Sequence, residues 1–341
     1  MKQARKRLAF AAGMFTSAIF LALAFRGLHP DQFWRSLSQI NPPLLLVAVL
    51  VYFFAVIIIA RRWQFLLHAI KSVPLPALAK LVFIGYMGNN VYPLRAGDAL
   101  RIILLRRNHQ VPLLRSTTVV ALERMFDGCV MLSFVLFSLL LIDVESAEVN
   151  TIVSLSAPLF AIALICAFTL AAKPNLLRRA LSPLLRLLPG QLGGTLGNFA
   201  EEILAGLEGL RSHRHLLGAV ICSYLTWAIE AGVYWIVMRA LDLELSYAVA
   251  LLLVGAVNLA GLIPASPGQV GVNEFVVISI LTALGIAAPL ATAFAVVVHL
   301  TIWLPITLAG FILLLKQGLG WADIGMAKEL KDAEAVRGDS S

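Results

Sequence analysis

Long uncharged apolar runs recur along the whole chain, and they restrict its fold more than any other feature. A helix needs about 20 mostly apolar residues to cross the ~30 Å hydrocarbon core of a bilayer, and runs of that order recur between residues 8 and 315. Of the 341 residues, 60% are hydrophobic and 13% are charged, whereas about a quarter of the residues in soluble domains are charged. The residue alternation typical of outer-membrane strands is not found. The sequence therefore predicts an all-α polytopic membrane protein.

The basic residues indicate how these runs cross the membrane. The net charge is +8, but Lys and Arg gather in short groups at the ends of apolar runs, as in cytoplasmic loops. We therefore expect the cytoplasmic (inner) membrane, cytoplasmic N and C termini and no nucleic-acid partner. Arg61 and Arg62 are interpreted as the cytoplasmic flank of the second span. The six predicted spans are residues 8–25, 44–60, 116–142, 151–172, 216–240 and 291–315.

Two further apolar segments are expected to enter the membrane and to return to the side from which they came. Residues 78–105 have basic groups at both ends and a break near Pro93 and Gly97, so a simple crossing would place five arginines outside. Residues 248–284 contain no Lys or Arg and are broken between residues 264 and 271. We predict two re-entrant helical hairpins that open to opposite faces. Paired breaks in inverted halves point to a transport site near the midplane.

Both breaks carry the pattern Pro-x-polar-x-Gly, which is compatible with an inverted repeat but is short enough to arise by chance. The chain is expected to form one transmembrane domain over residues 1–316, followed by a polar cytoplasmic tail at 317–341. Within the domain, the stretch at about 174–214 carries an apolar stripe opposite glutamates. That pattern is typical of an amphipathic helix that lies on a membrane or protein surface.

Polar residues cluster at the first break, where Asn90, Arg95, Asp98 and Arg101 lie close together in sequence. A helix that resumes near Gly97 places Asp98 and Arg101 on one face, where they can pair. A guanidinium binds phosphate through two parallel hydrogen bonds, which lysine cannot do. The alternative is an ordinary cytoplasmic loop with solvated charges.

The next span begins with a second charged group, Glu123, Arg124 and Asp127, whose spacing allows all three to face one side of a helix. Each ionisable residue near the bilayer centre costs about 2.5–3.5 kcal/mol on insertion scales, and such residues usually face the bundle interior or a wet cavity. At headgroup depth the cost is much lower. Two roles stay open, a clamp that joins the hairpin to this span and direct contact with a substrate.

At the second break, Ser266, Gly268 and Gly271 lead into a helix with Glu274 in its first turn. Glycine permits close backbone approach, and a helix N-terminus attracts anions. Glu274 either complements the helix dipole or needs a partner from elsewhere in the fold or a proton of its own, since no basic residue is near it in sequence.

Two spans carry isolated polar groups. Glu230 lies near the middle of the span at 216–240, with Ser223, Trp227 and Tyr234 on much the same face. His299 lies in the last span, and a lone intramembrane histidine is more often a helix-packing donor than a proton carrier. Glu230 is the better functional candidate, because burying a carboxylate is expensive.

Three motifs, in order, resemble the signature segments of the lysylphosphatidylglycerol synthase transmembrane, or flippase-like, family. They are Asn-Val-Tyr-Pro-Leu-Arg-Ala-Gly-Asp at 90–98 with Arg101, Glu-Arg-x-x-Asp at 123–127, and Pro-x-Ser-Pro-Gly-x-x-Gly-x-x-Glu at 264–274. The resemblance covers about residues 8–316. Asp98 stands where the family usually has Glu, and Gln269 stands where it usually has Gly. Neither change removes a charged group.

The resemblance implies the stand-alone translocation half of this family. The large aminoacyltransferase domain of two-domain relatives does not follow residue 316, so lipid aminoacylation is not expected. The leading hypothesis is a flippase or transporter for an anionic lipid, a polyprenyl-phosphate-linked lipid or a hopanoid-like lipid, with Arg95, Arg101 and Arg124 receiving a headgroup phosphate. No cofactor or metal is expected, and the sequence has no phosphate loop for ATP-driven pumping.

Two alternatives stay open beside this hypothesis. One is a membrane-embedded lipid-modifying transferase, in which Glu123 or Asp127 acts as base or metal ligand. The other is a membrane partner of a glycosyltransferase. Association with a second copy of the chain is also left open.

Overall fold

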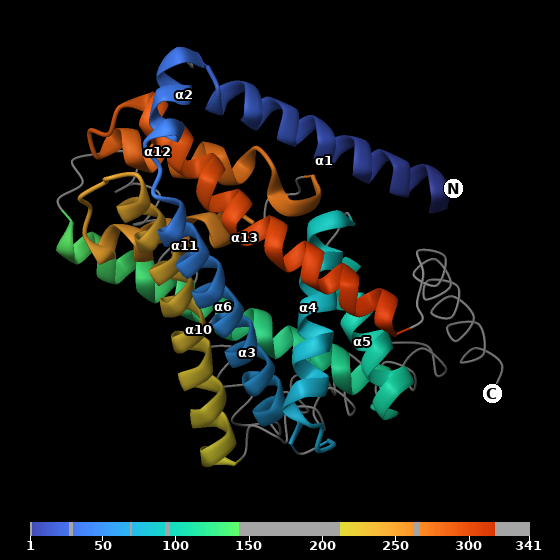
Figure 1. Cartoon of the computed structure of the whole chain (residues 1–341). Coiled ribbons are helices and arrows are strands. Elements are labelled where there is room, and N and C mark those ends of the chain that lie inside the picture. Colours follow the sequence, from blue (N-terminus) through green and yellow to red (C-terminus); the bar gives the residue numbers. More distant parts are fainter. Residues whose placement is uncertain are drawn as a thin grey trace, which may run out of the picture.

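The computed structural model describes residues 2–26, 30–68, 70–92, 96–142, 212–261 and 266–317, and within these ranges it contains helices and no strand (Figure 1). The helices are α1 (Lys2–Ala24), α2 (Pro30–Ser38), α3 (Pro42–Leu67), α4 (Leu75–Val91), α5 (Ala96–His109), α6 (Leu113–Leu141), α10 (His213–Ala240), α11 (Tyr247–Ala260), the short 3₁₀ helix η2 (Pro267–Gln269), α12 (Val272–Ala283) and α13 (Ala288–Lys316).

Four of these helices, α3, α6, α10 and α13, are long and apolar enough to cross a membrane. They coincide with four of the spans predicted from the sequence. The first predicted span falls on α1, whose shorter apolar part is Gly13–Ala24. The span predicted at 151–172 lies outside the described residues, as do the polar tail except Gln317 and nearly all of the amphipathic stretch. The all-helical membrane architecture is confirmed, and the count of six spans stays a prediction.

Proline marks where several helices begin. The first N–H groups of a helix have no acceptor within it, so proline is tolerated there. Pro42 and Pro43 open α3, Pro76 lies in the first turn of α4, and Pro289 lies in the first turn of α13. Pro305 lies inside α13, where neighbouring helices in a membrane bundle can satisfy the backbone groups that proline frees.

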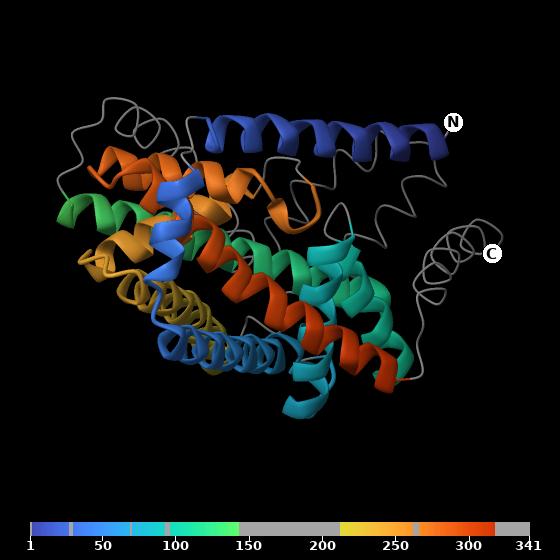
Figure 2. The ribbon, with the colours of Figure 1, turned by 45° about the horizontal axis from the view of Figure 1, so that its top comes forward.

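The long helices pack against one another along the bundle. α3 lies along α10, α6 along α11, and α13 along α4, while α1 runs on the outside over α12 (Figure 2). On α3, Leu46, Leu50 and Phe54 are exposed at four-residue spacing, whereas Ala48 and Ala55 are buried. An apolar face of this kind on a membrane-spanning helix faces lipid.

The first predicted hairpin is an antiparallel pair of helices, α4 and α5. Gly85 of α4 lies against the Arg101 side chain, and Gly88 lies against the backbone of Gly97. Later residues of α4 therefore meet earlier residues of α5. A Cβ atom on Gly97 would overlap the carbonyl oxygen of Gly85, so the two backbones touch and leave no room for side chains.

The second predicted break lies between α11 and α12, which pack against each other. Gly268 has φ +70° and Gly271 has φ +93°, a conformation that favours glycine. A Cβ on Gly268 would lie 3.4 Å from the Asn90 carbonyl oxygen, at the end of α4. The broken segment beyond α11 thus lies beside the end of α4, in agreement with the packing of η2 on α4.

The contact between α4 and α5 can be tested with two glycine substitutions. We expect Gly97→Ala to destabilise the protein by about 1–3 kcal/mol or more, because added atoms in a filled contact force the backbones apart. Gly232→Ala in α10 is the matched control, since its Cβ meets nothing within 4 Å and alanine favours helix by about 1 kcal/mol. Thermal unfolding in detergent measures both. Equal stability of the two variants would show that α4 and α5 do not touch at Gly97.

Candidate functional site

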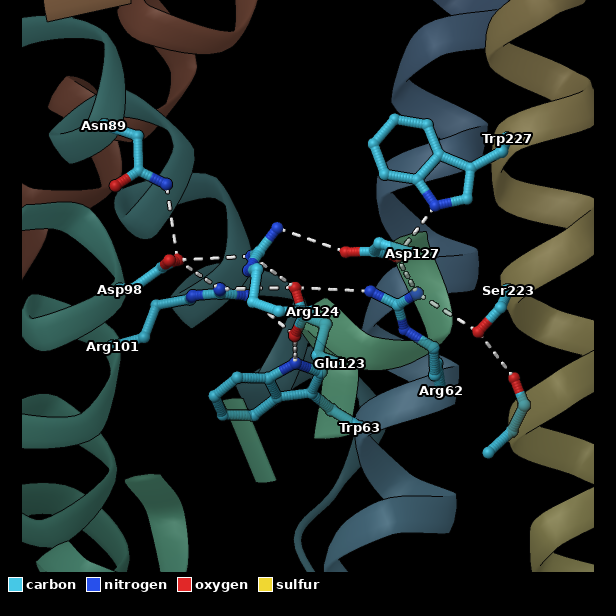
Figure 3. A network of polar contacts seen from close by, with 11 residues as sticks. Arg62, Trp63, Asn89, Asp98, Arg101, Glu123, Arg124, Asp127, Ser223 and Trp227 are labelled. Carbon is cyan, nitrogen blue, oxygen red and sulfur yellow. Dashed lines mark hydrogen bonds and ion pairs between the residues drawn. The ribbon is translucent and has the colours of Figure 1, made fainter. Parts of the chain in front are cut away.

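Three arginines and three carboxylates meet inside the bundle, where α3, α5 and α6 come together (Figure 3). When all six side chains are ionised, their three positive charges balance their three negative charges. A buried charge is strongly unfavourable unless it is paired and hydrogen-bonded. We call this group the central network; it consists of Arg62 from α3, Asp98 and Arg101 from α5, and Glu123, Arg124 and Asp127 from α6.

Glu123 lies at the centre of the central network and is fully buried. Its Oε1 atom lies 3.2 Å from Nη2 of Arg62, 3.3 Å from Nη2 of Arg101 and 2.7 Å from Nη2 of Arg124. The indole N–H of Trp63 donates to Oε2, and the Arg101 guanidinium lies over the Trp63 ring, 4.7 Å from its centroid. One carboxylate thus receives three guanidinium groups from three helices.

Asp127 joins the central network to α10. Its Oδ1 atom accepts hydrogen bonds from Nη1 of Arg62 at 2.6 Å and from the indole N–H of Trp227 at 2.7 Å. Nη1 of Arg62 also donates to Oγ of Ser223 at 3.2 Å. The face of α10 on which Ser223 and Trp227 were predicted to lie together is therefore the face that meets these charges.

Asp98 joins the central network to the hairpin of α4 and α5. Nη2 of Arg101 lies 2.5 Å from Oδ1 of Asp98, so the pair expected from their three-residue spacing is present. Arg124 and Asp127 also pair, with Nη1 3.1 Å from Oδ2. Asn89 of α4 donates to Asp98 at 3.3 Å, and Nη2 of Arg124 lies 3.4 Å from the same oxygen. The hairpin is thus clamped to α6 by charged groups.

The three arginines differ in how far a molecule outside the bundle can reach them. The side chains of Arg62 and Arg101 are 0% exposed, whereas that of Arg124 is 29% exposed. Arg124 contacts all three carboxylates of the central network. In the described part of the chain, the Nε atom of each arginine is buried without a hydrogen-bond acceptor. Arg124 is therefore the most exposed arginine of the central network.

A second polar group surrounds Glu274 at the start of α12. Its Oε2 atom accepts a hydrogen bond from the Gly271 N–H at 2.6 Å, which caps the helix, and its Oε1 atom pairs with Nδ1 of His299 on α13. Ser266 donates its backbone N–H to Oγ of Ser17 on α1 at 2.8 Å. The partner that Glu274 lacked in the local sequence is thus the histidine of the last long helix.

Neighbouring asparagines at the end of α4 contact the central network and the region of the second break. Asn89 donates to Asp98 in the central network. Asn90 donates to Oγ1 of Thr307 at 2.8 Å and lies with its backbone carbonyl oxygen next to Gly268. The end of α4 therefore contacts the central network, α13 and the segment that leads into α12.

Of the remaining candidates, the structure describes Glu230 but not Arg95. Glu230 is buried on α10 and its carboxyl group faces Asn258 of α11. In the described residues it pairs with no arginine. Arg95, like Pro93 and Pro264, lies outside the described residues.

Sequence reasoning missed two members of the site, Arg62 and Trp63. Arg62 was interpreted as a cytoplasmic flank, but it is fully buried and pairs with Glu123 and Asp127. The signal was the apolar sequence after it, because α3 continues through residues 63–67 to Leu67. An arginine one and a half turns before the end of a helix is not a flanking charge.

No group of three or more His, Cys, Asp or Glu side chains in the described ranges could hold a metal ion. The transferase alternative in which Glu123 or Asp127 binds a metal therefore gains no support from a ligand cluster in this part of the chain. Both carboxylates face guanidinium and indole donors.

The role of Glu123 can be tested by removing its charge. We expect Glu123→Gln to lower the free energy of unfolding by about 3–5 kcal/mol, because it leaves buried guanidinium groups with too few counter-charges. Glu244→Gln is the matched control, since Glu244 is exposed. Unfolding in detergent with increasing denaturant measures the difference. Equal midpoints for the two variants would contradict the central position of Glu123.

Comparison with known proteins agrees with this architecture. The chain is 23% identical to a protein named glycosyltransferase AglD from Haloferax volcanii, in an alignment that covers 89% of this chain and 54% of the relative. It thus spans about half the length of that protein. It is 24% identical to a UPF0104 membrane protein from Pyrococcus horikoshii, covering 80% of this chain and 86% of the relative. It is 23% identical to a UPF0104 membrane protein from Methanocaldococcus jannaschii, in an alignment that covers 87% of this chain and 91% of the relative.

A family match extends over nearly the whole chain. Residues 8–310 match the family described as the lysylphosphatidylglycerol synthase TM region. All the residues of the central network, and Glu274 with His299, fall within this match. The chain therefore belongs to the lysylphosphatidylglycerol synthase transmembrane-region family.

Proposed function

We propose that this membrane protein translocates a lipid, either an anionic lipid, a polyprenyl-phosphate-linked lipid or a hopanoid-like lipid. The observation that carries the proposal is the half-buried side chain of Arg124 at the edge of a charge-balanced network. An anionic headgroup can reach the guanidinium of Arg124, and this guanidinium contacts the other ionised groups of the network. Three membrane-length helices, α3, α6 and α10, contribute to this network or contact it.

The energetic argument favours a functional role over a purely structural one. Replacing a buried ion cluster with apolar residues of similar size is often neutral or stabilising, so packing alone does not require six charged groups. Intramembrane charged residues usually mark substrate or ion pathways. In the central network, the N–H donors of Arg124 that now contact carboxylates are also donors that can bind a phosphate.

Translocation requires that headgroup binding changes the contacts between helices. A phosphate on Arg124 competes with Asp98 of α5 and with Asp127 of its own helix for the same guanidinium. Release of Asp98 weakens the clamp between the hairpin and α6. Through Asn89 and Asn90 of α4, that change would be passed to Thr307 of α13 and to Gly268 at the second break.

The proposed topology has six spans and two re-entrant hairpins that open to opposite faces of the cytoplasmic membrane, with both termini in the cytoplasm. It is supported by the antiparallel packing of α4 and α5 and by the contact of Gly268 with the end of α4. We assign substrate handling to the following residues around the two breaks and on α10: Asn90, Arg95, Asp98, Arg101, Glu123, Arg124, Asp127, Glu230, Ser266, Gly268, Gly271 and Glu274.

Liposomes that contain the purified protein test the proposal directly. Fluorescent phosphatidylglycerol, a fluorescent polyprenyl phosphate and a fluorescent hopanoid are each placed in the membrane, and quenching from outside reports their movement. We expect Arg124→Gln to slow movement of the transported lipid by about tenfold to a hundredfold, because a hydrogen bond to a charged group is worth about 1.5–3 kcal/mol. Arg239→Gln, which removes an exposed arginine at the end of α10, is expected to have no effect.

Other outcomes of the same experiment separate the alternatives. Movement no faster than in protein-free liposomes for every lipid would reject translocation. Chemically altered lipid in the extract would support the transferase. Equal loss in Arg124→Gln and Arg239→Gln would show that Arg124 has no special role.

The second polar group provides an independent test. We expect Glu274→Gln to slow translocation about tenfold, which corresponds to about 1.4 kcal/mol on the barrier, while lipid binding is retained. The amide can still accept the Gly271 N–H but cannot hold a proton or pair with a charged His299. Glu244→Gln serves as control in the same transport assay. Unchanged transport in Glu274→Gln would remove this carboxylate from the mechanism.

The similarity to AglD favours a second candidate function. This chain aligns with about half of the length of that relative, which is named a glycosyltransferase. We therefore propose as the second candidate that this chain binds a separate glycosyltransferase at the membrane. Co-purification from native membranes, followed by identification of any glycosyltransferase retained, tests this candidate. A variant that no longer retains the glycosyltransferase but still translocates lipid would separate the two roles.

A further inference from the structure

A cavity of about 520 Å³ lies away from the central network, among the beginning of α4, the end of α5 and the end of α13. Figure 1 shows the last turns of α5 and α13 beside each other, and Nδ2 of Asn108 on α5 donates to Oε1 of Gln317 at 3.4 Å. Its volume is within the range of about 300–1,000 Å³ that is usual for ligand sites. The cavity is therefore large enough for a headgroup or a small ion with water.

The charged groups that line the cavity are all basic. Lys80 of α4 and Arg107 of α5 both line it, and His109 of α5 lines it as well. The described lining contains no carboxylate. Lys80 and Arg107 are both exposed, and in the described part of the chain neither forms an ion pair, so both are accessible to an anion.

The remaining walls complement these cations. The amides of Asn108 and Gln317 offer donors to an oxygen-rich ligand, whereas Pro74, Pro76 and neighbouring apolar side chains form the other wall. Burial, together with the charge of Lys71, lowers the pKa of His109 below its ordinary value. A lowered pKa favours the neutral imidazole, so Lys80 and Arg107 supply the positive charge of the lining.

We infer that this cavity binds an anionic phosphate group through Lys80 and Arg107. Lysine and arginine are the side chains that bind phosphate most often, arginine through its fork of donors and lysine as a point charge. A phospholipid headgroup and free inorganic phosphate share this chemistry, and the apolar wall suits the glycerol and the first methylenes of a lipid.

The inference does not depend on lipid translocation, because its residues are not those of the central network. Arg107 lies six residues beyond Arg101 on α5, which is a distance of about 9 Å along the helix. A bound anion at this place leaves the ion pairs of Glu123 intact. The cavity is thus a second anion site on the same hairpin and not an extension of the first.

The experiment uses the full-length protein, purified in detergent and depleted of lipid. Native mass spectrometry measures binding of dioleoylphosphatidylglycerol against dioleoylphosphatidylcholine, and calorimetry measures binding of inorganic phosphate. We expect Lys80→Gln and Arg107→Gln to weaken anion binding about fivefold each and the double variant about thirtyfold, as expected for two cations close to an anionic headgroup. Arg61→Gln, which removes an exposed arginine of α3 outside the cavity, should bind as the wild type does.

The probes also identify the source of the phosphate. Selective, saturable binding of phosphatidylglycerol without binding of inorganic phosphate supports a lipid site, and binding of inorganic phosphate supports a site for the free ion. Wild-type binding in the double variant, or no binding of either probe to the wild type, would overturn the inference. The charge-preserving variant Lys80→Arg with Arg107→Lys should restore binding, and its failure to do so in a folded protein would also contradict the assignment.

Discussion

The structure depends on the placement of one carboxylate, that of Glu123, between guanidinium groups from three helices. Without it, three guanidinium groups, two of them fully buried, would share only Asp98 and Asp127 as counter-charges, which is strongly unfavourable in a medium that solvates charge poorly. With it, α3, α5 and α6 are held at a common point. Gly85 of α4 leaves room for the Arg101 side chain, which a Cβ atom at this position would overlap.

The two polar groups lie on different helices, and the end of α4 lies near both. The central network lies on α3, α5 and α6, and the pair of Glu274 with His299 lies on α12 and α13. Asn89 of α4 contacts Asp98 in the central network, and the adjacent Asn90 contacts Thr307 of α13 and Gly268, in the segment that leads into α12. The orientation of α4 therefore affects the central network and the helices and break that position the second group.

Sequence patterns predicted what is local and missed what depends on packing. Hydropathy located four of the long helices. Helical spacing predicted the pair of Asp98 with Arg101 and placed Glu123, Arg124 and Asp127 on one side of a helix, because the members of each set lie on one helix. The contact of Arg62 with Asp127 joins residues 65 positions apart, and periodicity contains no information about which helices become neighbours. Arg62 was further obscured by Arg61, because two adjacent arginines after an apolar run resemble a cytoplasmic flank.

Charge balance determines what the central network can do with a ligand. A cation-rich site would bind an anion and retain it, since each unpaired guanidinium adds affinity. Here the three positive charges are already matched, so a bound phosphate leaves an excess of negative charge unless a carboxylate moves away or takes up a proton. Asp98 is the carboxylate best placed to move, because it lies near the start of α5 and is the only acidic member that α6 does not carry. Under the proposed lipid translocation, anion binding at Arg124 would displace the hairpin, and this displacement would couple headgroup binding to movement of the helices.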